Sequence, residues 1–233
     1  MTRSIATFAL ALFALLLAGC ESAQTPSGAL AAEETIERAR FSVQRIASQQ
    51  DMRDTVPGLL ARSKGVLIFP NLIKGAFLVG GEGGSGVLLT RDPQGNWSHP
   101  AFYTMGALSF GLQIGGQASE AVVIIMTDRA LQAIIDNQVK LGGDISAAAG
   151  PVGVGVGAGT TTNLGADVYT YSTAQGLFAG MSLEGAVVAR REDWNKAFYG
   201  PDATVRGIVM QRRYGDRRAD ALRETLARIA EGR

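Results

Sequence analysis

The chain has 233 residues, and its 22 lysines and arginines nearly balance its 21 aspartates and glutamates, which gives a formal net charge of +1. This balance argues against a protein that coats nucleic acid. An apolar share of 46% is typical of a globular chain with a core, and the single cysteine excludes an internal disulfide. Glycine is unusually common, with 30 residues, and shows no collagen-like period.

The N-terminal segment predicts export. Arg3 supplies a positive charge, and residues 5–16 are almost wholly apolar but too few to span a bilayer comfortably, so residues 1–19 are expected to be a signal peptide. Residues 17–20 (LAGC) match the lipobox of bacterial lipoproteins. We therefore expect Cys20 to carry a thioether-linked diacylglycerol and an N-acyl chain such as palmitate, and we expect no other cofactor.

The segment after the lipobox predicts a tether. Residues 20–32 are mostly small or polar, with one proline and one glycine, which is typical of a flexible link between a lipid anchor and a domain. Two or three acyl chains hold a protein at a membrane almost permanently. Because no aspartate follows Cys20, we expect an outer-membrane lipoprotein that faces the periplasm, with the inner membrane and the cell surface as alternatives.

After the tether, apolar residues recur at helical spacing. Ile36, Val43 and Ile46 recur at the period of an amphipathic helix over residues 33–50, and Thr55 before Pro57 predicts a second short helix that ends near residue 63. From residue 65 to residue 127, short apolar runs alternate with glycine, which predicts antiparallel strands. Residues 81–85 (GEGGS) and 92–96 (DPQGN) are expected to be turns between them.

The second half of the chain contains both helical and strand patterns. Thr127 is expected to cap a helix that ends near Asn137, strands are expected within 163–171 and 176–190, and helices over 192–199 and 216–230. These elements predict an α+β fold, with a glycine-rich antiparallel β-sheet or partly closed barrel and flanking N- and C-terminal helices. We expect one domain over 33–200 and a basic C-terminal helical tail over 201–233.

Residues 153–159 (GVGVGAG) alternate glycine with period two, which leaves one face of a strand without side chains. Close backbone packing in a curved sheet is the favoured interpretation. A groove for a lipid chain is the alternative.

A succession of motifs is similar to a known family. The chain contains, in this order, KGVLIFP at 64–70, GGEGGSG at 80–86, WSHPAFY at 97–103, SFGLQIG at 109–115, KLG at 140–142, AGPVG at 149–153, GLFAG at 176–180 and NKAFYG at 195–200. This succession resembles the lipid-binding SYLF domain family. The resemblance implies a glycine-rich β core with flanking helices, and a function in binding membrane lipids rather than in catalysis.

The same resemblance implies where lipid binds. Members of the family place a basic amphipathic N-terminal helix at the membrane, which here corresponds to Arg38, Arg40 and Arg45, although Glu33, Glu34 and Glu37 share that helix. The family's basic turn before the first strand is present as Arg62 and Lys64. We expect these two residues to meet a lipid phosphate, with an ordinary solvated pair as the alternative. The expected partners are anionic membrane lipids and not nucleic acid.

The inventory of reactive side chains disfavours an enzyme. His99, the only histidine, precedes a proline, and neither Ser98 nor Ser109 has another evident base. Carboxylates occur singly, so no metal site and no catalytic residue are expected. The alternative function is an envelope scaffold that binds another protein. An arginine-rich tail could contact such a partner or anionic lipid headgroups, although a solvated helix face is the favoured interpretation; its arginines are Arg206, Arg212, Arg213, Arg217, Arg218, Arg223 and Arg228.

Overall fold

The computed structural model describes residues 27–77, 79–110, 115–150, 165–174, 177–178, 183 and 185–232. It describes side chains for all of these except 75–77, 79–80, 108–110, 115–117, 149, 174 and 177–178. The predicted signal peptide, Cys20, most of the predicted tether and the glycine alternation at 153–159 lie outside the described residues.

Four long strands form the centre of the fold. They are β1 (Gly65–Phe77), β2 (Val79–Thr90), β3 (Ala101–Phe110) and β4 (Gly115–Ile125), and each pairs antiparallel with its neighbours. Shorter strands extend the sheet to the order β5-β9-β3-β2-β1-β4-β7-β6, with β8 paired to β7. These are β5 (Val139–Lys140), β6 (Ala147–Ala149), β7 (Val168–Ala174), β8 (Leu177–Phe178) and β9 (Val187–Arg190).

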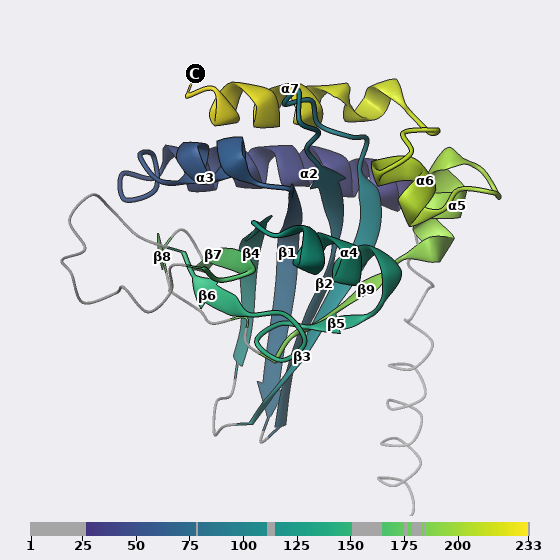
Figure 1. The fold of residues 1–233 in the computed structure, drawn as a ribbon. Coiled ribbons are helices and arrows are strands. Elements are labelled where there is room, and N and C mark those ends of the chain that lie inside the picture. The colour runs from purple at the N-terminus through teal and green to yellow at the C-terminus, as the bar shows by residue number, and fades with distance from the viewer. Residues whose placement is uncertain are drawn as a thin grey trace, which may run out of the picture.

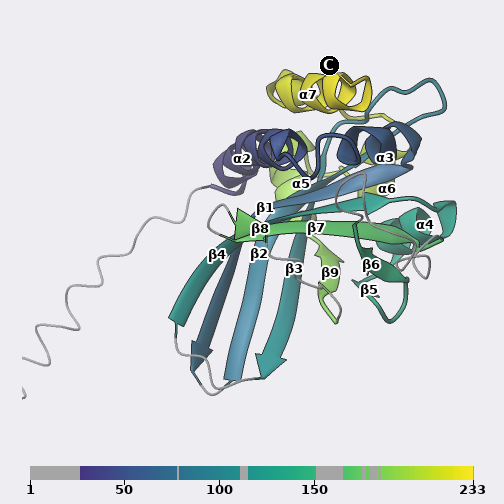
Figure 2. The same cartoon turned by 90° about the vertical axis from the view of Figure 1, so that its left-hand side faces the viewer.

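The sheet curls, so that its outer strands bend round toward one another on one face (Figure 2). Only β6 and β7 pair in parallel among the described strands. The predicted α+β class, with a mostly antiparallel sheet that is partly closed and flanked by N- and C-terminal helices, is confirmed.

The helices gather at one end of the long strands (Figure 1). There α7 lies over α2, and α2 lies over the sheet. Among the described residues, none of the helices is long and apolar enough to cross a membrane. The helical elements are α2 (Gly28–Ser48), α3 (Val56–Arg62), α4 (Asp128–Asp136), α5 (Glu192–Tyr199), α6 (Val205–Val209), the 3-10 turn η2 (Arg217–Ala219) and α7 (Asp220–Ala230).

Each face of the sheet has its own core. Val66 and Ile68 of β1 pack with α2, α3 and α7, whereas Leu67 and Phe69, on the other face, pack with α4 and α6. This division follows from the alternation of side chains along a strand. Among the described residues, the fully buried apolar side chains of the two cores lie between Ala32 and Leu226, so a chain of residues 21–233 retains them.

The first helix begins earlier than expected. It starts at Gly28 rather than near residue 33, because the Ser27 hydroxyl accepts a hydrogen bond from the Leu30 N–H and caps the helix there. The last five residues of the predicted tether are therefore helical. The predicted C-terminal tail also joins the domain, since Ile208, Leu222 and Leu226 are buried in the two cores.

The prediction of a turn at residues 81–85 is wrong, because β2 runs through them without a break. The glycines in this segment allow two strands to approach closely and do not form a turn. None of them has a positive φ. A Cβ atom on Gly84 would overlap the carbonyl oxygen of Asn71, in the bulged part of β1. Glycine is thus required where the bulge brings the β1 backbone against β2. The expected turn at 92–96 is present, with Gly95 at a φ of 92°.

Replacing Leu226 by alanine tests whether α7 belongs to the domain. Leu226 is fully buried between α7 and the rest of the core around α2, so the Leu226→Ala variant should lose about 2–5 kcal/mol of unfolding free energy. Urea denaturation of residues 21–233 measures this loss. The exposed Glu224→Ala variant on the same helix is the control and should stay within about 0.5 kcal/mol of the parent. Equal values for the two variants would contradict the packing of α7.

Candidate functional site

The three predicted lipid-binding arginines of α2 are all engaged in ion pairs. Arg38 pairs with Glu34 one turn earlier, and an Arg40 NH group lies 2.9 Å from the Glu37 carboxylate. Arg45 lies 2.7 Å from the carboxylate of Glu120 on β4. Exposed pairs of this kind contribute at most about 1 kcal/mol each, so an anionic headgroup can compete for the arginines. The pairs nevertheless leave α2 with little free positive charge.

The pair between Arg45 and Glu120 also joins α2 to the sheet. Burial raises the pKa of Glu120, and the Arg45 guanidinium opposes that rise. One carboxylate oxygen of Glu120 is buried without a hydrogen-bond partner. Arg45 is therefore a structural contact of α2 as well as a predicted lipid contact.

The outward face of α2 carries two large apolar side chains. Leu30 is 57% exposed and Phe41 is 51% exposed. Their spacing of eleven residues is close to three helical turns, which places them on the same side of α2. The Arg40 guanidinium lies 4.2 Å from the centre of the Phe41 ring. This combination of exposed apolar groups with neighbouring arginines is typical of helices that lie at a membrane interface.

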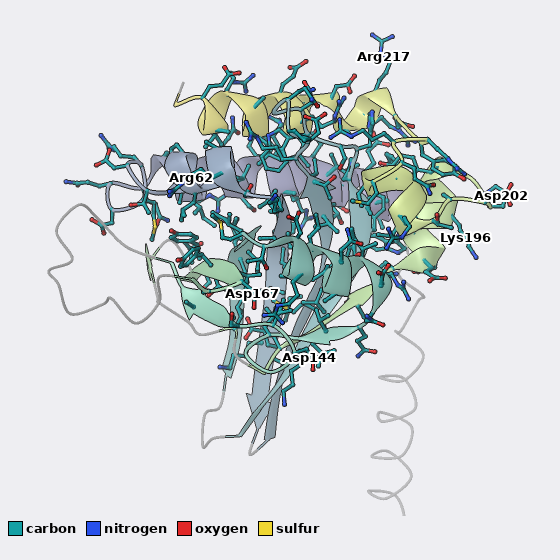
Figure 3. All side chains as sticks on the ribbon, in the orientation of Figure 1. Arg62, Asp144, Asp167, Lys196, Asp202 and Arg217 are labelled. Carbon is teal, nitrogen blue, oxygen red and sulfur yellow. The ribbon has the colours of Figure 1, made fainter. Side chains whose placement is uncertain are left out.

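Arg62 and Lys64 lie elsewhere, on the wall of a cavity of about 450 Å³. Figure 3 shows Arg62 beside α3. Two further cations, Arg91 and Arg212, line the same cavity, and only two carboxylates do. We call this cavity the basic pocket; its charged residues are Arg62, Lys64, Arg91, Arg212, Asp92 and Asp128, and its apolar residues are Pro93, Leu131, Val209 and Met210.

The basic pocket keeps part of its positive charge uncompensated. Lys64 Nζ lies 3.0 Å from Asp128, and Arg212 lies 2.9 Å from Asp92. By contrast, Arg62 donates to the Gly58 carbonyl and Arg91 to the Ala61 carbonyl, so neither is neutralised by these contacts. The Nε of Arg91 is buried without a partner. Arg212 has a φ of 53°, a conformation that is strained for a side chain of this size.

The structure thus divides the five predicted residues into two groups. Lys64 pairs with α4, which packs on the face of the sheet opposite to α2. Sequence reasoning missed Arg91 and assigned Arg212 only to the arginine-rich tail, because no local pattern indicates that these two distant residues meet beside Arg62. The one available signal is that Arg91 directly precedes the predicted turn at 92–96.

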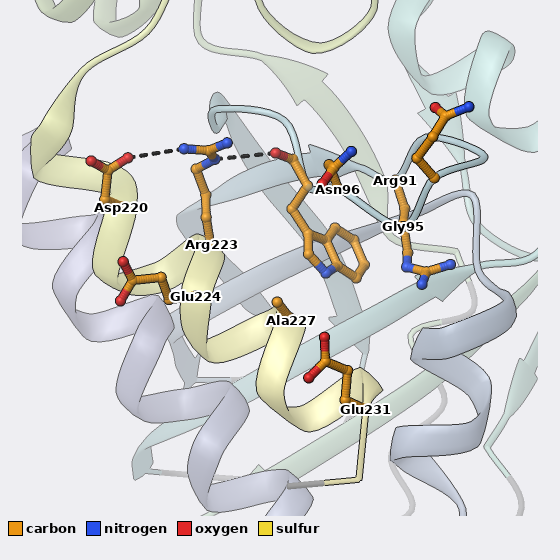
Figure 4. Close-up of a pocket in the computed structure, with 10 residues that line it drawn as sticks. Arg91, Gly95, Asn96, Asp220, Arg223, Glu224, Ala227 and Glu231 are labelled. Carbon is orange, nitrogen blue, oxygen red and sulfur yellow. Dashed lines mark hydrogen bonds and ion pairs between the residues drawn. The ribbon is translucent and has the colours of Figure 1, made fainter.

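A second cavity, of about 470 Å³, lies between the loop at 91–97 and α7 (Figure 4). Arg91 lines this cavity too. Arg223 donates to the Trp97 carbonyl over 3.1 Å and pairs with Asp220 at 2.9 Å, and the buried indole N–H of Trp97 has no partner. Glu224 and Glu231 line the side formed by α7. The cavity has mixed charge, and its lining contains no serine, threonine, cysteine, lysine or histidine.

The C-terminal arginines are largely occupied within the fold. Arg206 pairs with Asp136, and Arg218 pairs with both Asp216 and Glu33 of α2. Arg217 instead points away from the top of the molecule (Figure 3). Most of the tail's positive charge therefore serves contacts between elements rather than a surface patch.

Ser98 and His99 do not form a catalytic dyad. The Ser98 hydroxyl donates to the backbone carbonyl of His99 and accepts the N–H of Thr90, so it does not contact the imidazole. His99 Nδ1 accepts the N–H of Asp216 over 3.2 Å. The side chain of Ser109 is outside those described. In the part of the chain that the structure describes, no group of three metal-binding side chains comes together.

Comparison with known proteins identifies the family. The Ysc84 family model, whose description reads "Las17-binding protein actin regulator", matches residues 106–229, more than half of the chain. The chain belongs to this family. The SYLF resemblance of its motifs is thereby confirmed, and the match reaches into α7.

Three similar proteins support the assignment. SH3 domain-containing YSC84-like protein 1 of Homo sapiens is 36% identical over 174 residues, which are 74% of this chain and 49% of that protein. The Bos taurus protein of the same name is 35% identical over 174 residues, 74% of this chain and 50% of that protein. LAS seventeen-binding protein 3 of Saccharomyces cerevisiae is 35% identical over 159 residues, 67% of this chain and 34% of that protein. The chain spans about half the length of the first two relatives.

The stability of this Ysc84-family domain should depend on pH through its single histidine. Burial and the nearby Arg223 guanidinium lower the pKa of His99, and the N–H of Asp216 requires an unprotonated Nδ1. The unfolded chain therefore binds more protons than the folded one below about pH 6.5, so stability is full above that pH and falls as the pH drops through it.

Urea denaturation of residues 21–233 at pH 7.5, 6.5 and 5.5 measures this dependence. The His99→Asn variant keeps an acceptor for the Asp216 N–H but does not titrate, so its unfolding free energy should fall less over the same interval. Parallel pH profiles for the two proteins would contradict the role of His99.

Proposed function

We propose that this protein is a membrane-anchored lipoprotein, lipidated at Cys20, whose single SYLF-like domain binds membrane lipid without catalysis. Its place is the outer membrane, facing the periplasm. The observation that carries the proposal is the outward face of α2, where Leu30 and Phe41 are exposed beside arginines whose ion pairs are weak. Membership of the Ysc84 family supports a binding role.

The position of α2 relative to the proposed anchor supports the same function. Six residues lie between Cys20 and Ser27, and the seven Cα-to-Cα steps across them span about 25 Å at most when extended. A lipid on Cys20 would therefore keep the start of α2 within about 25 Å of the bilayer. Held at that distance, the helix would meet the membrane at a high effective concentration, so even a weak interfacial contact would be populated.

A second mode of lipid binding is favoured by the basic pocket. Its cations, among them Arg62, Arg91 and Lys64, suit a phosphate, and the apolar Leu131 and Met210 suit the adjoining part of an amphiphile. The basic pocket and the outward face of α2 have no residue in common, so substitutions can distinguish between them.

Binding of another envelope protein is the alternative function. The family description and the name of the Saccharomyces cerevisiae relative both state binding to a protein. A protein partner would cover the same exposed apolar residues of α2. A discrete crosslinked complex without vesicle binding would favour this alternative.

Mass spectrometry of the protein purified from bacterial membranes tests the anchor. The mature chain should begin at Cys20 and carry the added mass of a diacylglycerol and an amide-linked acyl chain. The Cys20→Ala variant should lack this mass and leave the membrane fraction. A mature chain that begins at another residue, or an unmodified Cys20, would contradict lipidation.

Vesicle co-sedimentation of residues 21–233, which lack the lipid, tests the domain. We expect binding to phosphatidylglycerol and cardiolipin vesicles, and a several-fold loss in the Arg38→Gln, Arg45→Gln double variant if α2 makes the contact. The Arg62→Gln, Lys64→Gln double variant should show that loss instead if the basic pocket does. Lys196→Gln, an exposed substitution on α5, is the control. No binding to any vesicle would favour the scaffold alternative.

A further inference from the structure

The helices cover only part of the four long strands. In Figures 1 and 2, β1 to β4 extend well beyond α2, α3 and α7, and the far ends of these strands form an open blade. The change shows within β1, where Val66 to Phe69 are fully buried but Ile73 is 60% exposed. Gly81, Gly106 and Ala118 on the neighbouring strands are exposed as well. The blade therefore contacts either solvent or a binding partner.

From Ile73 outward, the described positions on one face of the blade hold only glycine and apolar residues. The strand register aligns Ile73 with Gly83 and Gly106 on one side and with Ala118 on the other. Residues two positions further along each strand share this face. The next row is Leu108, Gly81, Gly75 and Gly116, and the row after it is Phe110, Val79 and Phe77.

The polar residues of the blade all fall on the opposite face. Lys74 is aligned with Glu82 and with Gln117, and Ala107 completes this row. The Ser119 hydroxyl donates to a Glu82 carboxylate oxygen over 2.9 Å. The next row on this face is Ser109, Gly80, Ala76 and Gly115. An antiparallel sheet with such a division has one face for water and one face that needs an apolar cover.

The apolar face is the face on which α2 packs. Glu120 lies two residues beyond Ala118 on β4, hence on the same face, and it pairs with Arg45 of α2. The core beneath α2 thus continues along the strands onto the open blade. The proposed lipid anchor is joined to the start of this same helix through only seven residues.

We infer that the apolar face of the blade, centred on Ile73, lies against the bilayer to which Cys20 is anchored and inserts into its interfacial region. This inference rests on the proposed function. A bilayer is the occupant that fits best, because the short link from Cys20 to α2 keeps this side of the domain near the membrane. Hydrocarbon chains also conform to a smooth surface in which about half of the positions lack side chains. In the blade β1 and β2 each pair with a strand on both sides, so insertion leaves unpaired backbone groups only along the outer edges of β3 and β4.

Insertion of this face implies binding that depends little on charge. The arginines of α2 are paired, and the apolar face contains no ionisable residue. Residues 21–233 should therefore keep substantial affinity for neutral phosphatidylethanolamine and phosphatidylcholine vesicles in high salt, where purely electrostatic binding is screened. The Ile73→Asp variant should bind these vesicles at least about tenfold more weakly. Gln117→Asp adds the same charge on the opposite face and should bind like the parent protein.

A single fluorescent label tests the geometry directly. Residues 21–233 contain no cysteine, since Cys20 is the only one in the chain, so Ile73→Cys and Lys74→Cys each allow one environment-sensitive label. With vesicles, the label at position 73 should shift to shorter wavelength and be quenched by spin-labelled acyl chains. The label at position 74, on the other face, should change little. Thermal unfolding of each variant verifies that the fold is retained.

The outcomes separate this inference from the function on which it rests. Absence of vesicle binding by the parent protein contradicts the proposed lipid-binding function itself. Binding with no change in the label at position 73 leaves that function standing and overturns the insertion of the blade. A shift at position 73 without vesicles that grows with protein concentration shows that a second copy of the chain covers this face, and it also overturns the inference.

Discussion

The burial of β1 on both faces is the constraint on which the rest of the structure depends. Val66 and Ile68 need cover on one face, and Leu67 and Phe69 need it on the other. The N-terminal α2 and the C-terminal α7 supply the first cover, and α4 and α6 supply the second. Because α2, α3 and α7 lie across one end of the four long strands, only that half of the sheet receives a core on both sides (Figure 1). The other half remains an open blade whose apolar face continues the surface beneath α2.

Charge serves mainly to hold this arrangement together. Arg45 joins α2 to β4, Arg218 joins the C-terminal segment to α2, and Lys64 joins β1 to α4. Such pairs fix the orientation of the helices without adding much stability. The basic pocket is the exception, since Arg62 and Arg91 there are bonded to backbone carbonyls rather than to carboxylates. A headgroup phosphate would find more uncompensated charge there than on α2.

Two different modes of membrane contact are therefore proposed for this domain. Electrostatic binding through arginines is sensitive to salt and to anionic lipid, whereas burial of glycine-rich apolar surface is not. A permanent lipid anchor would make either mode sufficient even if it is weak, because the domain never leaves the membrane. The family description and the name of one relative state binding to a protein, which is said of those proteins.

The sequence by itself determined the fold class, the helices at 192–199 and 216–230, and the family, because periodicity and motif order are local properties of the chain. It also identified Arg62 and Lys64 as neighbours before the first strand. Only the tertiary structure decided that Arg91 and Arg212 join them, and that each arginine of α2 has a carboxylate partner. The glycines at 81–86 show the reason. A glycine that permits a turn and one that permits close approach of two strands look alike in sequence, and the difference depends on whether a distant backbone, here the bulge of β1, lies against it.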